Sequence, residues 1–286
     1  MILVTGATGT IGSELVRQLA ARGEKVRALT RDPAKADVPA GVEVVRGDYL
    51  DQESVRAAMS GVTAAFLVGV PGPGALHDPE LVAAARAAGV GRLVKLSAIA
   101  TGDPDLGPSA TWHLPGERAL AESGAEWTVL RPSVFASNTL SWAHPIGAGE
   151  PVPNMTGEAR QGVVDPRDVS EVAARVLVEP GHTGRTYTLT GPAAIGVPEQ
   201  AVVLGEVLGR PVATRELSTE ESRGLLRAWG LGEEAVEAIL AGNAYVRQGR
   251  NEVVTDDVRT VLGRPARSYR EWAEDRRGAF GGSVSS

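Results

Sequence analysis

The sequence contains no cysteine. Without a thiol the chain can form no disulfide bond, no thiolate metal site and no cysteine nucleophile. Histidine is scarce as well, and the few that occur lie too far apart along the chain to suggest a local metal-binding motif. We therefore expect no metal centre. The histidines are His77, His113, His144 and His182.

Long hydrophobic runs and an excess of basic charge are also absent. No stretch approaches the roughly 18 apolar residues that a membrane-spanning helix needs, and Met1 leads into an apolar strand pattern without a basic leader. We therefore predict no membrane association and a cytoplasmic location. The formal net charge of −6 indicates no basic surface for nucleic acid, so the expected partner is a small molecule.

Basic residues do cluster near the C-terminus, but acidic residues alternate with them. Such mixed charge is typical of a solvated helical face and not of a binding surface. We therefore expect the following side chains to lie in solvent: Arg264, Arg267, Arg270, Glu271, Glu274, Asp275, Arg276 and Arg277.

Glycine is abundant, with 35 residues, and three of them are spaced three apart directly after the apolar run Ile2–Val4. In a strand-to-helix turn, such glycines make the tight bend, let backbone N–H groups approach a phosphate, and let the helix pack on its strand. Helical spacing of Ile11, Leu15 and Leu19 and a second strand at Val26–Thr30 complete a βαβ unit, which distinguishes this turn from an ordinary one. We predict a dinucleotide with its pyrophosphate at the helix N-terminus. The expected contacts are Gly6, Thr8, Gly9, Thr10, Ile11 and Gly12.

Strand and helix patterns alternate through the first half of the chain, with further strands at Val42–Val45, Ala64–Val68, Arg92–Ser97 and Trp127–Leu130. This alternation predicts an α/β fold, a Rossmann-type doubly wound parallel sheet over residues 1–135 that later segments complete. Residues 136–277, including a helix at 167–178 and a strand at 186–189, predict a smaller α/β lobe on the substrate side. Residues 278–286 are expected to form a disordered tail.

Four motifs together resemble those of a known family: the glycine turn, Gly47–Asp51 after the third strand, Leu96–Ala98 at the end of a later strand, and Leu130–Pro132. They are similar to motifs of atypical short-chain dehydrogenases/reductases and, more narrowly, of the NmrA-like branch. The resemblance covers most of the chain. It implies an NADPH quinone reductase, a triphenylmethane-dye reductase, an azoreductase or a redox-sensing regulator of that branch.

The resemblance also implies where the rest of the cofactor lies. Asp48 and Tyr49 would flank the adenine, and residues 68–70, including Val68 and Gly69, would run beside the ribose. For Asp48 a second interpretation stays open, because a carboxylate ahead of Ser54 can equally cap a turn or a helix.

The end of the second strand bears on the choice between NADP(H) and NAD(H). NAD sites usually place a carboxylate there for the ribose 2′-hydroxyl, whereas a 2′-phosphate needs a cation. Arg31 follows the strand, and a guanidinium can bind phosphate through two hydrogen bonds, which favours NADP(H). Asp32 keeps NAD(H) open, because a turn rotated by one residue would present its carboxylate to the ribose.

The usual proton donor of short-chain dehydrogenases, a Tyr-x-x-x-Lys pair on the helix after the serine-bearing strand, is missing. None of the four tyrosines lies between Ser97 and Arg131, and none has a lysine four residues later. By resemblance to NmrA-like reductases, His113 takes the tyrosine place and Glu117 the lysine place. Carbonyl and alcohol chemistry is therefore disfavoured. An acceptor that delocalises charge, such as a quinone, a dye or an azo bond, has less need of a dedicated acid.

Two polar side chains are candidate catalytic residues. His113 can donate a proton at neutral pH, although a histidine ahead of a helix often only caps or packs. Ser97 can orient the nicotinamide or the substrate, or simply end its strand. We expect Glu117 to be solvated or paired with a nearby cation such as Arg118, and not to act as a base.

The segment after the last strong parallel strand is expected to line the acceptor pocket, because open α/β sheets bind ligands at the carboxyl ends of their strands. An aromatic ring there could stack on a flat acceptor or belong to the core. The candidates are Phe135, Asn138 and Trp142.

Two functions of different classes remain. The sequence has no nucleophile elbow, no phosphate-binding loop ending in Gly-Lys-Ser/Thr and no His-Glu-x-x-His motif. The first hypothesis is an NAD(P)H-dependent reductase of quinone-like, azo or other delocalised aromatic acceptors. The second is a non-catalytic redox sensor that binds NADP(H) and signals to a protein partner. The cofactor turn supports both.

Overall fold

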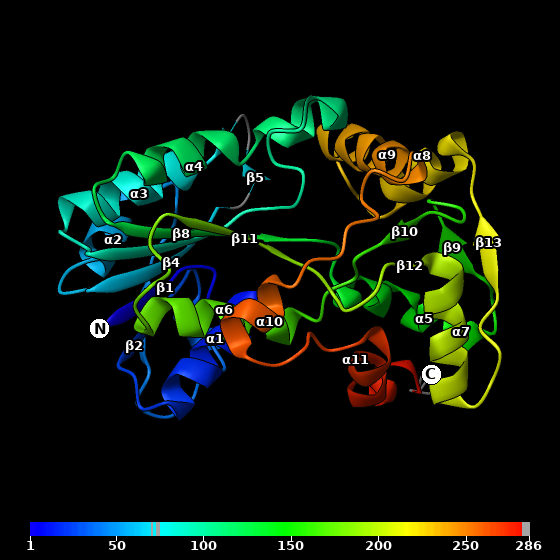
Figure 1. Ribbon diagram of the computed structural model, residues 1–286, viewed down its shortest axis with the longest axis horizontal. Coiled ribbons are helices and arrows are strands. Elements are labelled where there is room, and N and C mark those ends of the chain that lie inside the picture. Colours follow the sequence, from blue (N-terminus) through cyan, green and yellow to red (C-terminus); the bar gives the residue numbers. More distant parts are fainter. Residues whose placement is uncertain (70, 73–74, 282–286) are drawn as a thin grey trace.

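The computed structural model describes residues 1–69, 71–72 and 75–281. At its centre lies a parallel sheet of seven strands (Figure 1), which are, in spatial order, β11 (Arg185–Leu189), β8 (Glu126–Pro132), β7 (Arg92–Leu96), β4 (Ala64–Val68), β1 (Ile2–Val4), β2 (Val26–Thr30) and β3 (Glu43–Arg46). The strand order reverses at β1, which pairs with β2 on one side and β4 on the other. This is the doubly wound sheet that the alternation predicts, and the carboxyl ends of β1 and β4 are its switch point.

Helices cover both faces of the sheet (Figure 1). One face carries α1 (Thr10–Ala21), α6 (Pro166–Val178) and α10 (Asp257–Leu262), and the other carries α2 (Gln52–Ala58), α3 (Asp78–Ala87) and α4 (Leu114–Ala121). Successive strand residues point to opposite faces, so Phe66 packs with α1 and Leu67 packs with α3. Both faces of the sheet are therefore apolar and buried, which is typical of parallel strands.

The remaining elements form a smaller lobe beside the sheet (Figure 1), with a core built around Trp142, Trp272 and Phe280. Its helices are α5 (Ala143–Ala148), α7 (Val197–Leu208), α8 (Thr219–Ala228), α9 (Glu233–Arg247) and α11 (Tyr269–Asp275), and its strands are β9 (Val152–Asn154), β10 (Arg160–Gln161), β12 (Ile195–Gly196) and β13 (Thr214–Glu216). Short elements complete the chain: β5 (Pro71–Gly72), β6 (Ala75–Leu76) and the 3₁₀ helices η1 (Pro33–Lys35), η2 (Pro104–Thr111), η3 (Ala136–Trp142) and η4 (Arg277–Phe280).

Two segments that the sequence assigns to the smaller lobe belong to the main sheet. Strand β11 pairs in parallel with β8, with Arg185 opposite Thr128, and α6 packs against α1. The Ser170 hydroxyl of α6 donates to the carbonyl oxygen of Ile11 at 3.0 Å. A parallel strand needs a crossover helix, and α6 supplies it. The sheet is thus completed from beyond residue 135.

The C-terminal segment is ordered further than the sequence predicts. Arg277–Phe280 forms the 3₁₀ helix η4, and the Phe280 ring is buried edge-on against Trp272. Burial of an aromatic ring holds this turn in place, so order does not end at residue 278. Residues 282–286 lie outside the described part of the chain. In the ranges that the structure describes, no helix combines the length and apolar character needed to cross a bilayer.

Candidate functional site

The glycine turn joins β1 to α1, and its geometry leaves no room for a Cβ at Gly12 and little at Gly6. Gly6 has a φ of +60°, which favours glycine, and a Cβ on Gly12 would lie only 2.1 Å from the Gly6 carbonyl oxygen. Gly9 caps α1 without a side chain, and the first turn of the helix carries no acidic residue. A helix N-terminus left open in this way attracts an anion. These residues therefore fit the pyrophosphate of a dinucleotide.

The predicted contacts within the turn differ in exposure. Thr8 and Thr10 are exposed at the start of α1, whereas the Ile11 side chain is buried in the core and leaves only its backbone for a ligand. The Thr5 hydroxyl accepts a hydrogen bond from the backbone N–H of Val68 at 2.8 Å. The turn is thereby tied to the end of β4.

At the end of β2, two neighbouring charged residues have different environments. One carboxylate oxygen of Asp32 accepts a hydrogen bond from the N–H of Ala34 at 3.2 Å, and the other lies 3.2 Å from the Lys35 ammonium. Asp32 thus caps η1. Arg31 is exposed and forms no ion pair with any residue in the described ranges. An unpaired guanidinium therefore stands at the position that distinguishes the two cofactors.

Asp48 forms a turn of its own. Its carboxylate accepts a hydrogen bond from the N–H of Leu50 at 3.0 Å, which is an Asx turn, and its N–H donates to the Ser54 hydroxyl at 3.0 Å. The cap of α2 is Asp51. The geometry matches the turn interpretation of Asp48 and leaves one carboxylate oxygen for a ligand.

Tyr49 and Val68 at the end of β4 lie against the glycine turn. Burial is the largest influence on the Tyr49 hydroxyl and raises its pKa, while hydrogen bonds with Thr5 and the Gly6 backbone oppose this. A Cβ on Gly6 would lie 3.3 Å from the Val68 Cβ. Gly69 follows directly, and residue 70, the last of the predicted ribose stretch, lies outside the described residues.

Just beyond β7, Ser97 is joined to Glu117 and Arg131. The Ser97 hydroxyl donates to Glu117 Oε1 at 2.6 Å, and Arg131 binds both carboxylate oxygens, at 3.0 and 2.5 Å. The Glu117 side chain is only 12% exposed. Of the two alternatives predicted for Glu117, pairing with a cation is confirmed and solvation is not; the cation is Arg131 of β8 instead of Arg118. This pair fixes α4 to the strand ends.

A second polar cluster lies deeper, between β7, α3 and the start of α4. Lys95 and Asp78 form an ion pair with an Nζ–Oδ2 distance of 2.6 Å, and their side chains are 0% and 1% exposed. The Lys95 ammonium also lies 2.9 Å from the Leu96 carbonyl oxygen and 3.2 Å from Nδ1 of His113. Nδ1 is 3.4 Å from the same Asp78 oxygen, and the His113 ring is 20% exposed. His113 therefore links a buried ion pair to the surface.

Glycines make room for this cluster. A Cβ on Gly116 would lie 2.3 Å from the Asp78 Cβ and 2.6 Å from the Lys95 Cε, and a Cβ on Gly69 would lie 2.1 Å from Asp78 Oδ1. Burial is the largest influence on Lys95 and lowers its pKa against the attraction of Asp78. Burial also acts to raise the pKa of Asp78, but its polar contacts and the charge of Lys95 outweigh burial and leave this pKa lowered. Asp78 is therefore ionised at neutral pH.

Reasoning from the sequence did not identify Asp78 and Lys95. The available signal was a lysine within the apolar strand Arg92–Leu96 of a sheet covered on both faces, where a charge has to be buried and paired. Side chains alternate along a strand, so Lys95 shares the face of Leu93, which packs with α3. Its partner gave no such signal, because an aspartate in the first turn of a helix is ordinary.

The structure separates the three predicted pocket residues. Trp142 is 7% exposed and packs in the core of the smaller lobe, which corrects the expectation that it contacts an acceptor. Phe135 is half-buried, and its backbone forms a parallel bridge with Val164. Asn138 is exposed on η3. Phe135 and Asn138 thus retain surface for a ligand.

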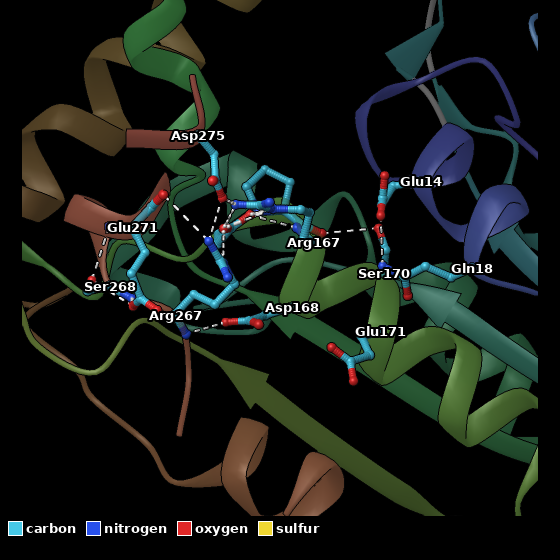
Figure 2. A network of polar contacts seen from close by, with 12 residues as sticks. Glu14, Gln18, Arg167, Asp168, Ser170, Glu171, Arg267, Ser268, Glu271 and Asp275 are labelled. Carbon is cyan, nitrogen blue, oxygen red and sulfur yellow. Dashed lines mark hydrogen bonds and ion pairs between the residues drawn. The ribbon is translucent and has the colours of Figure 1, made fainter. Parts of the chain in front are cut away.

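A network of charges ties α6 to the C-terminal segment at the junction of the lobes (Figure 2). Asp168 is fully buried and accepts hydrogen bonds from Arg264 at 2.8 Å and from the backbone N–H of Arg267 at 2.7 Å. The Arg267 guanidinium also binds Asp165 at 2.9 Å and Asp275 at 2.5 Å. Burial is the largest influence on Asp168 and raises its pKa. Arg264 and Arg267 are therefore not the solvated residues that the sequence predicts.

The same network lines a surface pocket of about 450 Å³ beside α1 and α6. Its three arginines, Arg167, Arg264 and Arg267, all bind carboxylates of the network. A pocket whose cations are already neutralised offers an anion little attraction, so we place no ligand there.

The smaller lobe also contacts the loop that precedes His113. The Tyr245 hydroxyl of α9 donates to Asp103 at 2.7 Å, and Arg250 forms an ion pair with Asp105. Burial, reinforced by Asp103, raises the pKa of Tyr245 to about 12. These contacts fasten η2, which leads into α4, to the other lobe.

Comparisons with known proteins agree with this geometry. Residues 6–180 match the family described as NAD(P)H-binding. A (4-alkanoyl-5-oxo-2,5-dihydrofuran-3-yl)methyl phosphate reductase of Streptomyces griseus subsp. griseus is 43% identical, over 98% of this chain and 99% of its own. An NAD(P)H azoreductase of Xenophilus azovorans is 34% identical, over 98% and 99%.

Among solved structures, the NADPH-dependent quinone oxidoreductase of Escherichia coli, determined with NADPH bound, superposes with a TM-score of 0.85. It is 27% identical, and the match covers 96% of this chain and 99% of that chain. Both lobes are therefore shared, and the matched family segment includes the glycine turn, Lys95 and His113.

Proposed function

Because this chain belongs to the NAD(P)H-binding family, in the NmrA-like branch of the atypical short-chain dehydrogenases/reductases, we propose that this NAD(P)H-dependent reductase transfers hydride to quinone-like, azo or other delocalised acceptors. The observation that carries the proposal is the open N-terminus of α1 at the switch point of the sheet. Strands β1, β4 and β7 are neighbours, so the glycine turn and the His113 cluster lie along one edge. A cofactor and a proton donor can serve one site there.

NADP(H) is the proposed cofactor. Support comes from Arg31, which has no ion-pair partner in the described ranges, and from Asp32, whose carboxylate caps η1. When bound, the dihydronicotinamide supplies the hydride. The residues proposed to hold the cofactor are Gly6, Thr8, Gly9, Thr10, Ile11, Gly12, Arg31, Asp48, Tyr49, Val68, Gly69 and Ser97.

On the acceptor side, His113 is the proposed proton donor. Its ring is the exposed end of a buried polar cluster, which suits a group that delivers one proton to a small molecule. The Ser97 hydroxyl is bound to Glu117, so we assign it a role in orienting the site through its remaining lone pairs. Phe135 and Asn138 are the proposed acceptor contacts.

A second acceptor class is favoured by the relative that is 43% identical over nearly the whole chain. Its name describes a dihydrofuranone whose ring double bond is conjugated with two carbonyl groups. Such a lactone is not aromatic, but it also spreads the incoming charge over several atoms. We therefore extend the proposed acceptors to conjugated carbon–carbon double bonds.

The experiment is a spectrophotometric assay of NADPH oxidation with quinones, azo dyes, triphenylmethane dyes and an acyl dihydrofuranone. A matched pair of variants controls for contaminating reductases. Gly12→Ala introduces a Cβ 2.1 Å from a backbone oxygen, whereas Gly147→Ala meets no atom within 4 Å. We expect turnover by the unmodified protein and by Gly147→Ala, and its loss in Gly12→Ala.

No turnover with any acceptor would contradict the reductase proposal. Stoichiometric NADP(H) binding under those conditions would then favour the redox sensor, and calorimetry with a candidate regulator would have to show that the partner changes NADP(H) affinity.

A further inference from the structure

The buried Lys95 ammonium has three protons, and the structure provides three acceptors for them. These are the Leu96 carbonyl oxygen at 2.9 Å, Asp78 Oδ2 at 2.6 Å and His113 Nδ1 at 3.2 Å. A fully buried ammonium is costly unless each N–H is satisfied. The third hydrogen bond is therefore part of what keeps Lys95 charged inside the protein.

This hydrogen bond fixes the protonation of the imidazole. An ammonium can only donate, so Nδ1 of His113 has to be the acceptor and carries no proton, and a neutral ring then bears its proton on Nε2. The opposite arrangement, Nδ1–H donating to Asp78, has the longer distance of 3.4 Å and would set that N–H against the ammonium. Across the part of the chain that the structure describes, Nε2 has no hydrogen-bond partner.

We infer that Lys95 and Asp78 are positioning residues that hold His113 as its Nε2–H tautomer, with that proton free for a ligand. The assignment of the tautomer stands on these contacts alone, and its catalytic consequence rests on the proposed function. Lys95 acts on the ring directly. Asp78 acts through Lys95, because it supplies the counter-charge that lets the ammonium stay buried.

The ion pair is hard to explain as packing. Replacing a buried ion pair with well-packed apolar residues is often neutral or stabilising, and the pair is set among apolar side chains such as Leu67, Leu93 and Val129. Gly116 and Gly69 leave space for these side chains and for no Cβ of their own. The fold thus makes room for an ion pair in a place that apolar side chains could fill.

The proton movement balances. An acceptor that has gained a hydride carries a new electron pair on oxygen or nitrogen, and the Nε2–H bond breaks as its proton moves to that pair. Nδ1 takes a proton from the Lys95 ammonium, so the imidazole stays neutral and Lys95 becomes an amine beside Asp78. Burial lowers the pKa of Lys95, which assists this release. A solvent proton taken up at Nε2 reverses the shift and restores the ammonium.

The test is two-bond ¹⁵N–¹H correlation spectroscopy of the histidines, without cofactor or acceptor, at about pH 8, above the usual imidazole pKa. The His113 signals are assigned by their loss in His113→Gln, and the exposed His144 serves as an internal reference for a free ring. We expect His113 as Nε2–H with no minor form and His144 as a tautomer mixture. A His113 mixture like that of His144, or the Nδ1–H form, would overturn the inference.

Two variants sharpen the test. In Lys95→Met the nearest group to Nδ1 is the Asp78 carboxylate, so the ring should move its proton to Nδ1. The matched control Lys35→Met removes a lysine from an exposed ion pair and should leave His113 unchanged. If Lys95→Met does not fold, Lys95→Met/Asp78→Asn removes both charges and should return His113 to a mixture. An unchanged tautomer in the variant that folds would refute the positioning role.

The kinetic arm connects this result to the proposed function. Lys95→Met should lower kcat for the acceptor about tenfold or more, with KM for NADPH nearly unchanged, because only proton delivery is impaired. A shifted tautomer with unaltered kcat would separate the positioning role from catalysis and refute its catalytic part. Because the spectra need no turnover, failure of the reductase proposal leaves the assignment of the tautomer intact.

Discussion

Asp168 at the lobe junction and Asp78 beneath the site are both buried carboxylates that face a cation. Both oxygens of Asp168 receive hydrogen bonds, from Arg264 and from the Arg267 backbone. Asp78 holds Lys95 with one oxygen, while its Oδ1 has no partner among the described residues. Their pKa values also differ in direction: burial raises that of Asp168, whereas the polar and charged contacts of Asp78 lower its pKa against burial.

The contrast extends to the surrounding groups. At the junction, Arg264 and Arg267 each bind two acidic side chains. At the carboxyl edge of the sheet, Nε2 of His113 and the guanidinium of Arg31 lack partners within the described ranges. Fully satisfied charges hold elements together, and incompletely satisfied ones mark where a ligand can bind. The following predictions probe this division.

The largest expected effect is on stability at the junction. Asp168→Ala leaves Arg264 partly unpaired and removes the acceptor of a buried N–H, which should lower the free energy of unfolding by about 3–5 kcal/mol. Urea denaturation measures this loss, and kcat of the protein that remains folded should not change. A large fall in kcat would show that the junction also serves the chemistry.

The next effect is on turnover. His113→Gln should lower kcat about 10²-fold by removing a proton donor, with little change in stability because the ring is partly exposed and the glutamine oxygen can accept the Lys95 hydrogen bond. Steady-state kinetics and thermal unfolding on the same preparation separate the two quantities. A large loss of stability alongside the loss of activity would instead show that His113 has a structural role, like the charges at the lobe junction.

A smaller effect is expected at the unpaired guanidinium. Arg31→Ala should weaken NADPH binding about 10- to 100-fold, since charge-assisted hydrogen bonds contribute about 1.5–3 kcal/mol. NADH binding should change less than twofold, as NADH has no 2′-phosphate. Fluorescence titration with both cofactors provides the measurement. Similar losses of affinity for NADPH and NADH would show that Arg31 does not bind the 2′-phosphate.

The smallest effect is the acid dependence of stability. The pKa of Asp78 is lowered from about 3.8, so its stabilisation is present above the unfolded pKa and is lost as pH falls through the folded one. The pKa of Asp168 is raised from about 3.8, so its contribution is present below the unfolded pKa and is lost as pH rises through the folded one. On acidification, Asp78→Asn should therefore lose less stability than the unmodified protein, and Asp168→Asn should lose more. Urea titrations at several acidic pH values would contradict this if both variants deviated in the same direction.

The sequence predicts the sheet and the glycine turn because both depend on local patterns. Strand β2 (Val26–Thr30) and the helix that follows the glycines are encoded by residues a few positions apart. The ion pairs are encoded differently. Arg264 lies 96 residues from Asp168, and nothing near Arg264 in the sequence identifies its partner. The alternation of basic and acidic residues around Arg264 predicts solvent exposure, whereas folding brings Arg264 against the buried Asp168 carboxylate.

The same limit applies within the site. The resemblance placed His113 at the proton-donor position, and that role stays a proposal. Lys95 is a visible anomaly in an apolar strand, but only the crossing of α3 and α4 over β7 brings Asp78 and His113 to it. Trp142 is ambiguous in the sequence because an aromatic side chain suits both a core and a pocket, and its burial in the apolar cluster of the smaller lobe favours the core.

The hydrogen bond between Tyr245 and Asp103 spans 142 residues of sequence and joins the α8–α9 hairpin to the loop in front of His113. That hairpin has its own small apolar cluster, separate from the core that holds the glycine turn. Changes within the hairpin are therefore expected to leave the core around the glycine turn intact. In directed evolution toward a new acceptor, the segments to randomise are therefore α9 and the loop that it contacts around Asp103.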